Sequence, residues 1–218
     1  IFGNPGTSES PIMNELESHP DLQYILVLQE GVAMGMADAY ARATGKPSFV
    51  NLHIETGLAN SISLLHNAYD GGTSIVLSAG NKDIRELAQD RTDLTEMVRP
   101  FTKWTAEVTH PDQFPSVMRR AFNEAKTPPT GPTFVGFSAN ALDGQADVEI
   151  IPSPRGYFRV APDPRAIESA TRILSTASSP TMIVSDRVAE SGATAKAVRV
   201  AEMLGARVYA ARYSAVNF

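Results

Sequence analysis

Residues 24–52, YILVLQEGVAMGMADAYARATGKPSFVNL, hold two short apolar runs with a helical pattern between them. The runs at 24–28 and 49–52 are apolar almost throughout, which is typical of strands covered on both faces. In the intervening residues 31–43, apolar side chains recur on one face at helical spacing, namely Val32, Met36, Ala39 and Tyr40. Strand, helix and strand in this order predict a crossover unit and a parallel sheet, whose ligands bind beyond the carboxyl ends of the strands.

The same alternation continues on both sides of this stretch. A preceding helix is expected to begin at Ser8 or Ser10, either of which could cap it, and to end near residues 19–20. Further helices are expected at 59–69 and 111–125, and further strands at 75–77 and 133–137. Residues 1–142 therefore predict an α/β fold, a three-layer domain with a mainly parallel sheet.

A weaker pattern follows this first domain. Residues 143–164 contain Gly, Pro and isolated apolar residues, which predicts an interdomain linker. Beyond it, the pattern predicts two helices and two strands in alternation, at 165–177, 181–184, 193–204 and 207–210. Residues 165–218 are thus expected to be part of a second α/β domain, which stops unfinished.

Composition narrows the classes of function. A net charge of −5 and a pI near 5.4 over 218 residues argue against a nucleic-acid partner. No apolar run is long enough to cross a membrane, so no membrane role is expected. The absence of Cys excludes disulfides and thiolate zinc sites and agrees with a cytoplasmic location. Because the chain opens at Ile1 as if at a strand end, we expect it to be part of a longer protein.

Three features at predicted strand ends could carry chemistry, and each has a simpler explanation. The turn Gly3-Asn4-Pro5-Gly6-Thr7-Ser8 is either a connector or a backbone wall for a flat ligand. Glu30 either complements a helix dipole or is a desolvated carboxylate with a raised pKa that shares a proton with a ring nitrogen. His53 is either structural or an acid or base near neutral pH.

Four motifs, taken in order and spacing, carry a resemblance. They are Phe2-Gly3-Asn4-Pro5-Gly6, Leu28-Gln29-Glu30-Gly31, Ala37-Asp38-Ala39-Tyr40-Ala41-Arg42 and Asn51-Leu52-His53, and Lys103-Trp104 and Gly131-Pro132 also agree. Together they resemble the thiamine diphosphate-dependent 2-oxo-acid decarboxylases of the benzoylformate decarboxylase type. The similarity covers residues 1–141 closely. It implies that residues 1–142 are the pyrimidine-binding domain and that 165–218 begin the central domain.

The resemblance also implies roles for individual residues. Glu30 would bond to N1′ of the aminopyrimidine and favour the tautomer that removes the thiazolium C2 proton. His53 would transfer protons and contact the substrate. The resemblance further assigns cofactor contacts to Pro5, Gly6 and Asn60 and a substrate contact to Thr7.

The implied partners are a small 2-oxo acid and further copies of the chain. The cofactors would be thiamine diphosphate and Mg²⁺, whose ligands are expected in a C-terminal domain, since the family's G-D-G segment has no counterpart here. The expected assembly is a homodimer or homotetramer. No metal ligand is assigned within these 218 residues.

Several alternatives stay open. Acetolactate synthases and acyl-CoA lyases share the Glu and A-D-x-Y-A-R signals, although His53 disfavours them. Glu55 stands where relatives mostly carry small residues, which indicates a different substrate pocket. A truncated, inactive domain that serves only in assembly is a hypothesis of another class. A nucleotide-binding module is disfavoured because neither phosphate-loop pattern is present.

Overall fold

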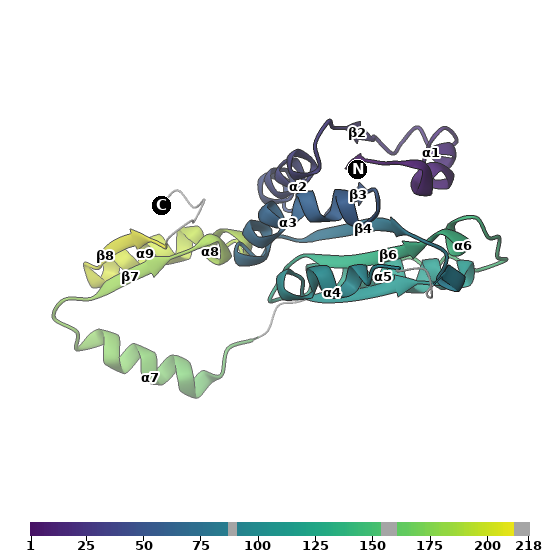
Figure 1. Cartoon of the computed structure of the whole chain (residues 1–218). Helices are drawn as coiled ribbons and strands as arrows, with labels where there is room; N and C mark the ends of the chain where they lie inside the picture. The colour runs from purple at the N-terminus through teal and green to yellow at the C-terminus, as the bar shows by residue number, and fades with distance from the viewer. Residues whose placement is uncertain (87–90, 154–160, 212–218) are drawn as a thin grey trace. The chain divides into compact units, whose positions relative to one another are not determined.

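The computed structural model describes residues 1–86, 91–153 and 161–211, and the chain divides into two compact units, residues 1–158 and 159–218 (Figure 1). Of the linker predicted at 143–164, residues 154–160 lie outside the described residues. Residues 143–153 form no helix or strand, and the next helix begins at Pro164. The domain boundaries stay a prediction.

The first unit is built on a six-stranded sheet in which all neighbouring strands are parallel. The strands are β1 (Phe2–Asn4), β2 (Ile25–Leu26), β3 (Ser48–Leu52), β4 (Ile75–Asn81), β5 (Trp104–Val108) and β6 (Thr133–Ser138). Their order across the sheet is β2-β1-β3-β4-β6-β5. The predicted parallel α/β fold is confirmed.

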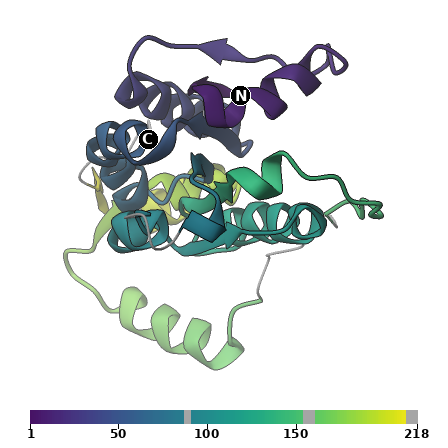
Figure 2. The ribbon, with the colours of Figure 1, turned by 45° about the vertical axis from the view of Figure 1, so that its right-hand side comes forward.

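Helices cover both faces of this sheet (Figures 1 and 2). The α-helices are α1 (Ser10–Leu16), α2 (Glu30–Thr44), α3 (Ile54–Asp70), α4 (Leu94–Val98), α5 (Phe114–Lys126) and α6 (Ala139–Leu142). Short 3-10 helices are η1 (Thr7–Glu9), η2 (Ile84–Glu86), η3 (Arg99–Phe101) and η4 (Pro111–Gln113). Helices α2, α3 and α4 share one apolar core with the sheet, and α5 and α6 share the other.

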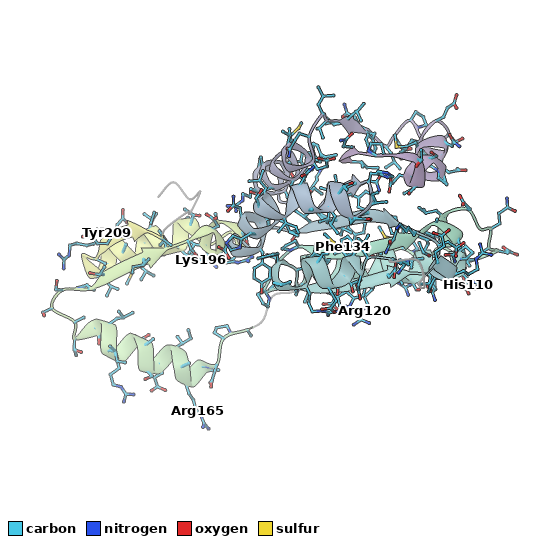
Figure 3. All side chains as sticks on the ribbon, in the orientation of Figure 1. His110, Arg120, Phe134, Arg165, Lys196 and Tyr209 are labelled. Atoms are coloured by element: carbon cyan, nitrogen blue, oxygen red, sulfur yellow. The ribbon has the colours of Figure 1, made fainter. Side chains whose placement is uncertain are left out.

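Alternation along the strands explains why the central runs are apolar throughout. In β4, Leu77 packs into the core under α2 and α3, whereas its neighbour Val76 packs into the core under α5. In β6, Phe134 and Val135 divide in the same way; Phe134 is labelled in Figure 3. Because both faces of a central strand are buried, most of its side chains are apolar, and buried polar ones such as Asn51 and Ser78 are hydrogen-bonded to each other.

The strand predicted at 24–28 is shorter than expected, and the expectation that it is covered on both faces is wrong. Only Ile25–Leu26 pair with β1, at the edge of the sheet. Val27 is buried, but Leu26 and Leu28 are 65% and 97% exposed. Leu26 and Leu28 are two positions apart, so they project to the same side of the chain, which is exposed, while Val27 projects to the buried side.

The apolar face predicted for residues 31–43 also points away from the core of this unit. Val32, Met36 and Tyr40 on α2 are exposed. The buried face consists instead of small residues and one methionine, namely Gly31, Ala33, Met34, Ala37 and Ala41. Small side chains allow α2 to lie close to β1, β3 and α3, which explains why the buried face carries little hydrophobic signal.

Helix α1 begins at Ser10, as predicted, but it ends at Leu16, before the predicted residues 19–20, and its predicted cap is wrong. Neither Ser8 nor Ser10 caps the first helix: Glu9 occupies the N-cap position without a capping side-chain bond, and Ser10 is the first residue of α1. Helix α3 begins at Ile54, directly after β3, instead of at residue 59. Strand β5 was not predicted at all, since four of its five residues are only half buried and show no clean period.

The second unit contains α7 (Pro164–Ser175), β7 (Thr181–Val184), α8 (Asp186–Glu190), α9 (Thr194–Leu204) and β8 (Arg207–Ala210). Strands β7 and β8 pair in parallel, as the alternation predicted. Its buried apolar side chains among the described residues are Val184 and Ala201. No helix in the described parts of either unit is long and apolar enough to cross a membrane.

Candidate active site

The candidate residues gather where the parallel strands end. Asn4 is the last residue of β1, His53 directly follows β3, and Gly80 lies near the end of β4. Glu30 begins α2, which follows the edge strand β2. Because β1 lies between β2 and β3, the crossover topology brings these positions to one edge of the sheet.

Glu30 is held by two asparagine side chains. The Nδ2 of Asn4 donates to Oε1 of Glu30 at 3.0 Å, and the Nδ2 of Asn60 donates to Oε2 at 3.0 Å. The two carboxylate oxygens together have about four lone pairs, so after these bonds and the one from its own backbone N–H the carboxylate can still accept a further hydrogen bond. The carboxylate is therefore oriented but not saturated.

The pKa of Glu30 reflects opposing influences. Partial burial by itself raises this pKa, but hydrogen bonds from its own backbone N–H, Asn60 and Asn4 lower it. The result is a pKa below the ordinary value for a glutamate. The raised pKa expected from the sequence presupposed a bound ring that presses on the carboxylate; in the chain by itself the amide donors outweigh desolvation.

His53 contacts a carboxylate that the sequence did not single out. The Nδ1 of His53 lies 3.0 Å from Oε2 of Glu9, a residue with no exposed surface. The same Oε2 accepts a bond from Gly6 N at 2.8 Å, and Oε1 accepts one from Gly80 N at 2.8 Å. A single buried carboxylate thus connects η1, the end of β3 and the end of β4.

Two glycines make room for this pair. A Cβ on Gly6 would lie 2.4 Å from the His53 ring, and a Cβ on Gly80 would lie 2.1 Å from Oε1 of Glu9. Both separations are too short for any side chain. Gly6 therefore permits the histidine ring to rest on the backbone of the turn, and Gly80 permits Glu9 to reach the β4 amide.

Residues 1–100 match the family model described as thiamine pyrophosphate enzyme, N-terminal TPP binding domain. Residues 1–100 therefore belong to this domain family. Thiamine pyrophosphate and thiamine diphosphate are the same cofactor, so the family inferred from the sequence motifs is confirmed.

Three known proteins show how far the similarity extends. Benzoylformate decarboxylase from Pseudomonas aeruginosa is 30% identical over 94% of this chain and 39% of its own length. Acetolactate synthase from Arthrospira platensis is 27% identical over 93% of this chain and 37% of its own length. The structure of benzoylformate decarboxylase from Polynucleobacter necessarius has a TM-score of 0.87 at 28% identity and covers 98% of this chain and 40% of that one. The chain thus spans about two fifths of these relatives.

In the first unit, the A-D-x-Y-A-R motif is a structural element. Asp38 accepts hydrogen bonds from Thr73 Oγ1 at 2.6 Å and from Arg42 Nε at 3.0 Å. Thr73 lies in the turn between α3 and β4, where a Cβ on Gly71 would collide with the Arg42 guanidinium. The motif therefore ties α2 to the entry of β4 and sets the orientation of the helix that presents Glu30.

The junction between β3 and α3 is strained. Ile54 has a φ of +38°, a backbone conformation that costs a β-branched residue about 1–3 kcal/mol. It separates His53 from Glu55, whose Oε2 is buried without a hydrogen-bond partner among the described residues. The strain lets the chain turn into α3 immediately after His53.

The structure places the other predicted residues as follows. Pro5 and Gly6 form the half-buried turn after β1, and Thr7 is exposed at the start of η1. Asn60 is brought to Glu30, as described above. Sequence reasoning missed Glu9, Gly80 and the role of Asn4, because a buried carboxylate and its amide donors come from three separate strand ends. No local pattern marks such a contact.

Proposed function

We propose that this domain acts in a thiamine diphosphate-dependent decarboxylase that cleaves a 2-oxo acid of the benzoylformate class. The observation that carries the proposal is the Glu30 carboxylate, oriented by Asn4 and Asn60 with acceptor capacity to spare. The similarity to benzoylformate decarboxylases supports the same assignment.

The residues present fit the pyrimidine half of the cofactor. The turn at Pro5-Gly6 directly follows Asn4, whose side chain holds Glu30, so its backbone lies close to the carboxylate that would meet the ring. Glu30 would exchange a proton with the ring nitrogen N1′, and Asn60 would keep its carboxylate in place. When bound, the cofactor supplies the electron sink for decarboxylation. His53 would move a proton at the substrate, with Thr7 lining the same region.

The diphosphate and a divalent metal would be held elsewhere. No group of three or more His, Cys, Asp or Glu in the described part of the chain is arranged to hold a metal ion. We propose that these ligands, including those of Mg²⁺, come from a further domain, and that the active assembly is a homodimer or homotetramer. Exposed apolar side chains on β2 and α2 support the second point, since such surface is costly to leave in water.

An acetolactate synthase is the second candidate, supported by the similarity to that enzyme. It is disfavoured by His53, whose fixed position after β3 suits proton transfer to the carbon that loses CO₂. Product analysis separates the two: a decarboxylase releases an aldehyde from benzoylformate, whereas a synthase joins two pyruvates.

The central test is Glu30→Gln in the active enzyme. Turnover should fall by about 10²- to 10⁴-fold, because the amide cannot exchange the required proton. The matched control is Glu15→Gln, which changes an exposed carboxylate on α1 and should leave turnover unchanged. Near wild-type turnover of Glu30→Gln, with cofactor bound, would remove this residue from the mechanism.

A further inference from the structure

Glu9 is a charged residue buried inside the first unit, and the catalytic assignments above do not use it. It has no exposed surface, yet both its oxygens have partners: Gly80 N on Oε1, and Gly6 N and His53 Nδ1 on Oε2. Burying a carboxylate costs free energy unless it is fully hydrogen-bonded, so Glu9 needs these three partners to stay buried.

The contacts fix the proton on the histidine ring. Two of the three partners are backbone N–H groups, which can only donate, so the Glu9 oxygens act as acceptors. An acceptor facing Nδ1 requires a proton on Nδ1. In the neutral ring the other nitrogen, Nε2, then carries a free lone pair.

The ring is also held in place on its other side. The Gly6 backbone lies against Cγ, Nδ1 and Cδ2 of His53, where a Cβ would approach to within 2.6 Å of each atom. Because Nδ1 is the nitrogen that faces Glu9, Nε2 is the ring nitrogen left without a contact to this carboxylate. The histidine side chain remains 31% exposed, so its free nitrogen can meet a ligand.

We propose that Glu9 is a positioning residue, which holds His53 in the Nδ1–H tautomer so that Nε2 is the atom that accepts and returns protons. This inference rests on the proposed function insofar as His53 meets the substrate. Tyr24 stays a neutral phenol beside this pair, because burial and then the Glu9 charge raise its pKa.

Nitrogen NMR of the ¹⁵N-labelled 218-residue chain tests the tautomer directly. Long-range ¹H–¹⁵N correlation spectra distinguish the protonated from the bare ring nitrogen, and with four histidines in the chain, His53→Gln assigns the signal. Above the titration range of imidazole, the wild-type spectrum should show His53 protonated on Nδ1. A spectrum with the proton on Nε2 would overturn the proposal, whatever the enzyme's activity.

The Glu9→Gln variant tests whether the Glu9 carboxylate is what keeps the proton on Nδ1 of His53. An amide cannot satisfy all three partners, so the Nδ1–H state should be lost, while circular dichroism reports whether the fold persists. The control is Asp70→Asn, which removes an exposed carboxylate 3.6 Å from His66 Nε2 and should leave the His53 signal unchanged. A folded Glu9→Gln chain that keeps Nδ1–H would assign Glu9 a purely structural role. If the variant does not fold, the wild-type spectrum together with Glu9→Asp, which retains a carboxylate, decides.

The functional arm separates this inference from the proposed function. In the active enzyme Glu9→Gln should lower kcat by about 10²-fold with little change in KM, and Glu9→Asp should recover part of the loss. Unchanged kcat in Glu9→Gln overturns the positioning role. An inactive wild-type enzyme whose His53 carries the Nδ1 proton would instead refute the proposed function and uphold the tautomer.

Discussion

At the scale of single residues, the site depends on side-chain amides and backbone N–H groups that stabilise carboxylates. Asn4 and Asn60 hold Glu30, while Gly6 and Gly80 hold Glu9. Neutral donors of this kind orient a carboxylate without adding a competing positive charge. The negative charge of Glu30 therefore stays available to a ligand that brings its own donor, whereas Glu9 is buried and is not.

The pKa of Glu30 is a measurable consequence. Since its folded-state pKa is lowered, Glu30 stabilises the fold fully above the ordinary pKa near ~4.3, and this contribution is lost as the pH falls through the folded-state value. In Asn60→Ala, which removes one donor, the pKa should rise toward the ordinary value. Carbon NMR of the Glu30 carboxyl over an acid titration measures this pKa in the wild-type chain and in Asn60→Ala.

Exposed Glu17 serves as the internal control in these spectra, since removing the Asn60 side chain should leave its carboxyl signal unchanged. A Glu30 titration that does not move when Asn60 is removed would mean that the side-chain amide has no influence on the carboxylate in solution.

At the scale of elements, signature residues hold helices in place. Asp38 and Arg42 connect α2 to the turn before β4 through Thr73. Lys103 donates to the carbonyls of Glu124 and Thr127 at the end of α5, and burial lowers its pKa. Figure 3 labels Arg120 on the same helix, where its guanidinium lies 5.1 Å from the centre of the Trp104 ring.

Thr73→Val tests the link between α2 and β4. It leaves the part-buried Asp38 without one donor and should lower the free energy of unfolding by about 1–2 kcal/mol. Thr44→Val is the matched control, because this threonine is exposed at the end of α2 and its loss should change stability by at most about 0.5 kcal/mol. Urea denaturation of the three chains compares them, and equal effects of both substitutions would contradict the role given to Asp38.

At the scale of the whole molecule, the described residues would supply one side of the proposed cofactor site. Glu30, Asn60 and the Gly6 turn would contact the pyrimidine, but the described residues offer no cluster that would hold the metal of the diphosphate. Exposed apolar side chains on β2, on α2 and between them would be available to the second copy in the proposed assembly, namely Leu26, Leu28, Val32, Met36 and Tyr40.

The 218-residue chain by itself should therefore bind thiamine diphosphate weakly and decarboxylate no 2-oxo acid, even with magnesium. The charged diphosphate would stay in water without a metal or helix-terminal amides. Calorimetric titration with cofactor, with and without magnesium, measures this. Micromolar or tighter binding that requires the metal would show that the chain contains a diphosphate site.

How much of the structure could be predicted from the sequence depends on how far apart along the chain the interacting residues lie. Apolar runs and helical spacing predicted the parallel sheet, and the motifs around Glu30 and His53 predicted the family, because both signals are local in the chain. Only the tertiary structure decided which side of β2 and which side of α2 is buried. Each element carries apolar or small residues on both sides, so its sequence pattern does not say which side is covered. It also decided that Glu9 meets His53 across 44 positions of sequence. That contact exists because the parallel strands end at one edge of the sheet. Gly6 beside the His53 ring and Gly80 beside Glu9 leave room for the buried carboxylate.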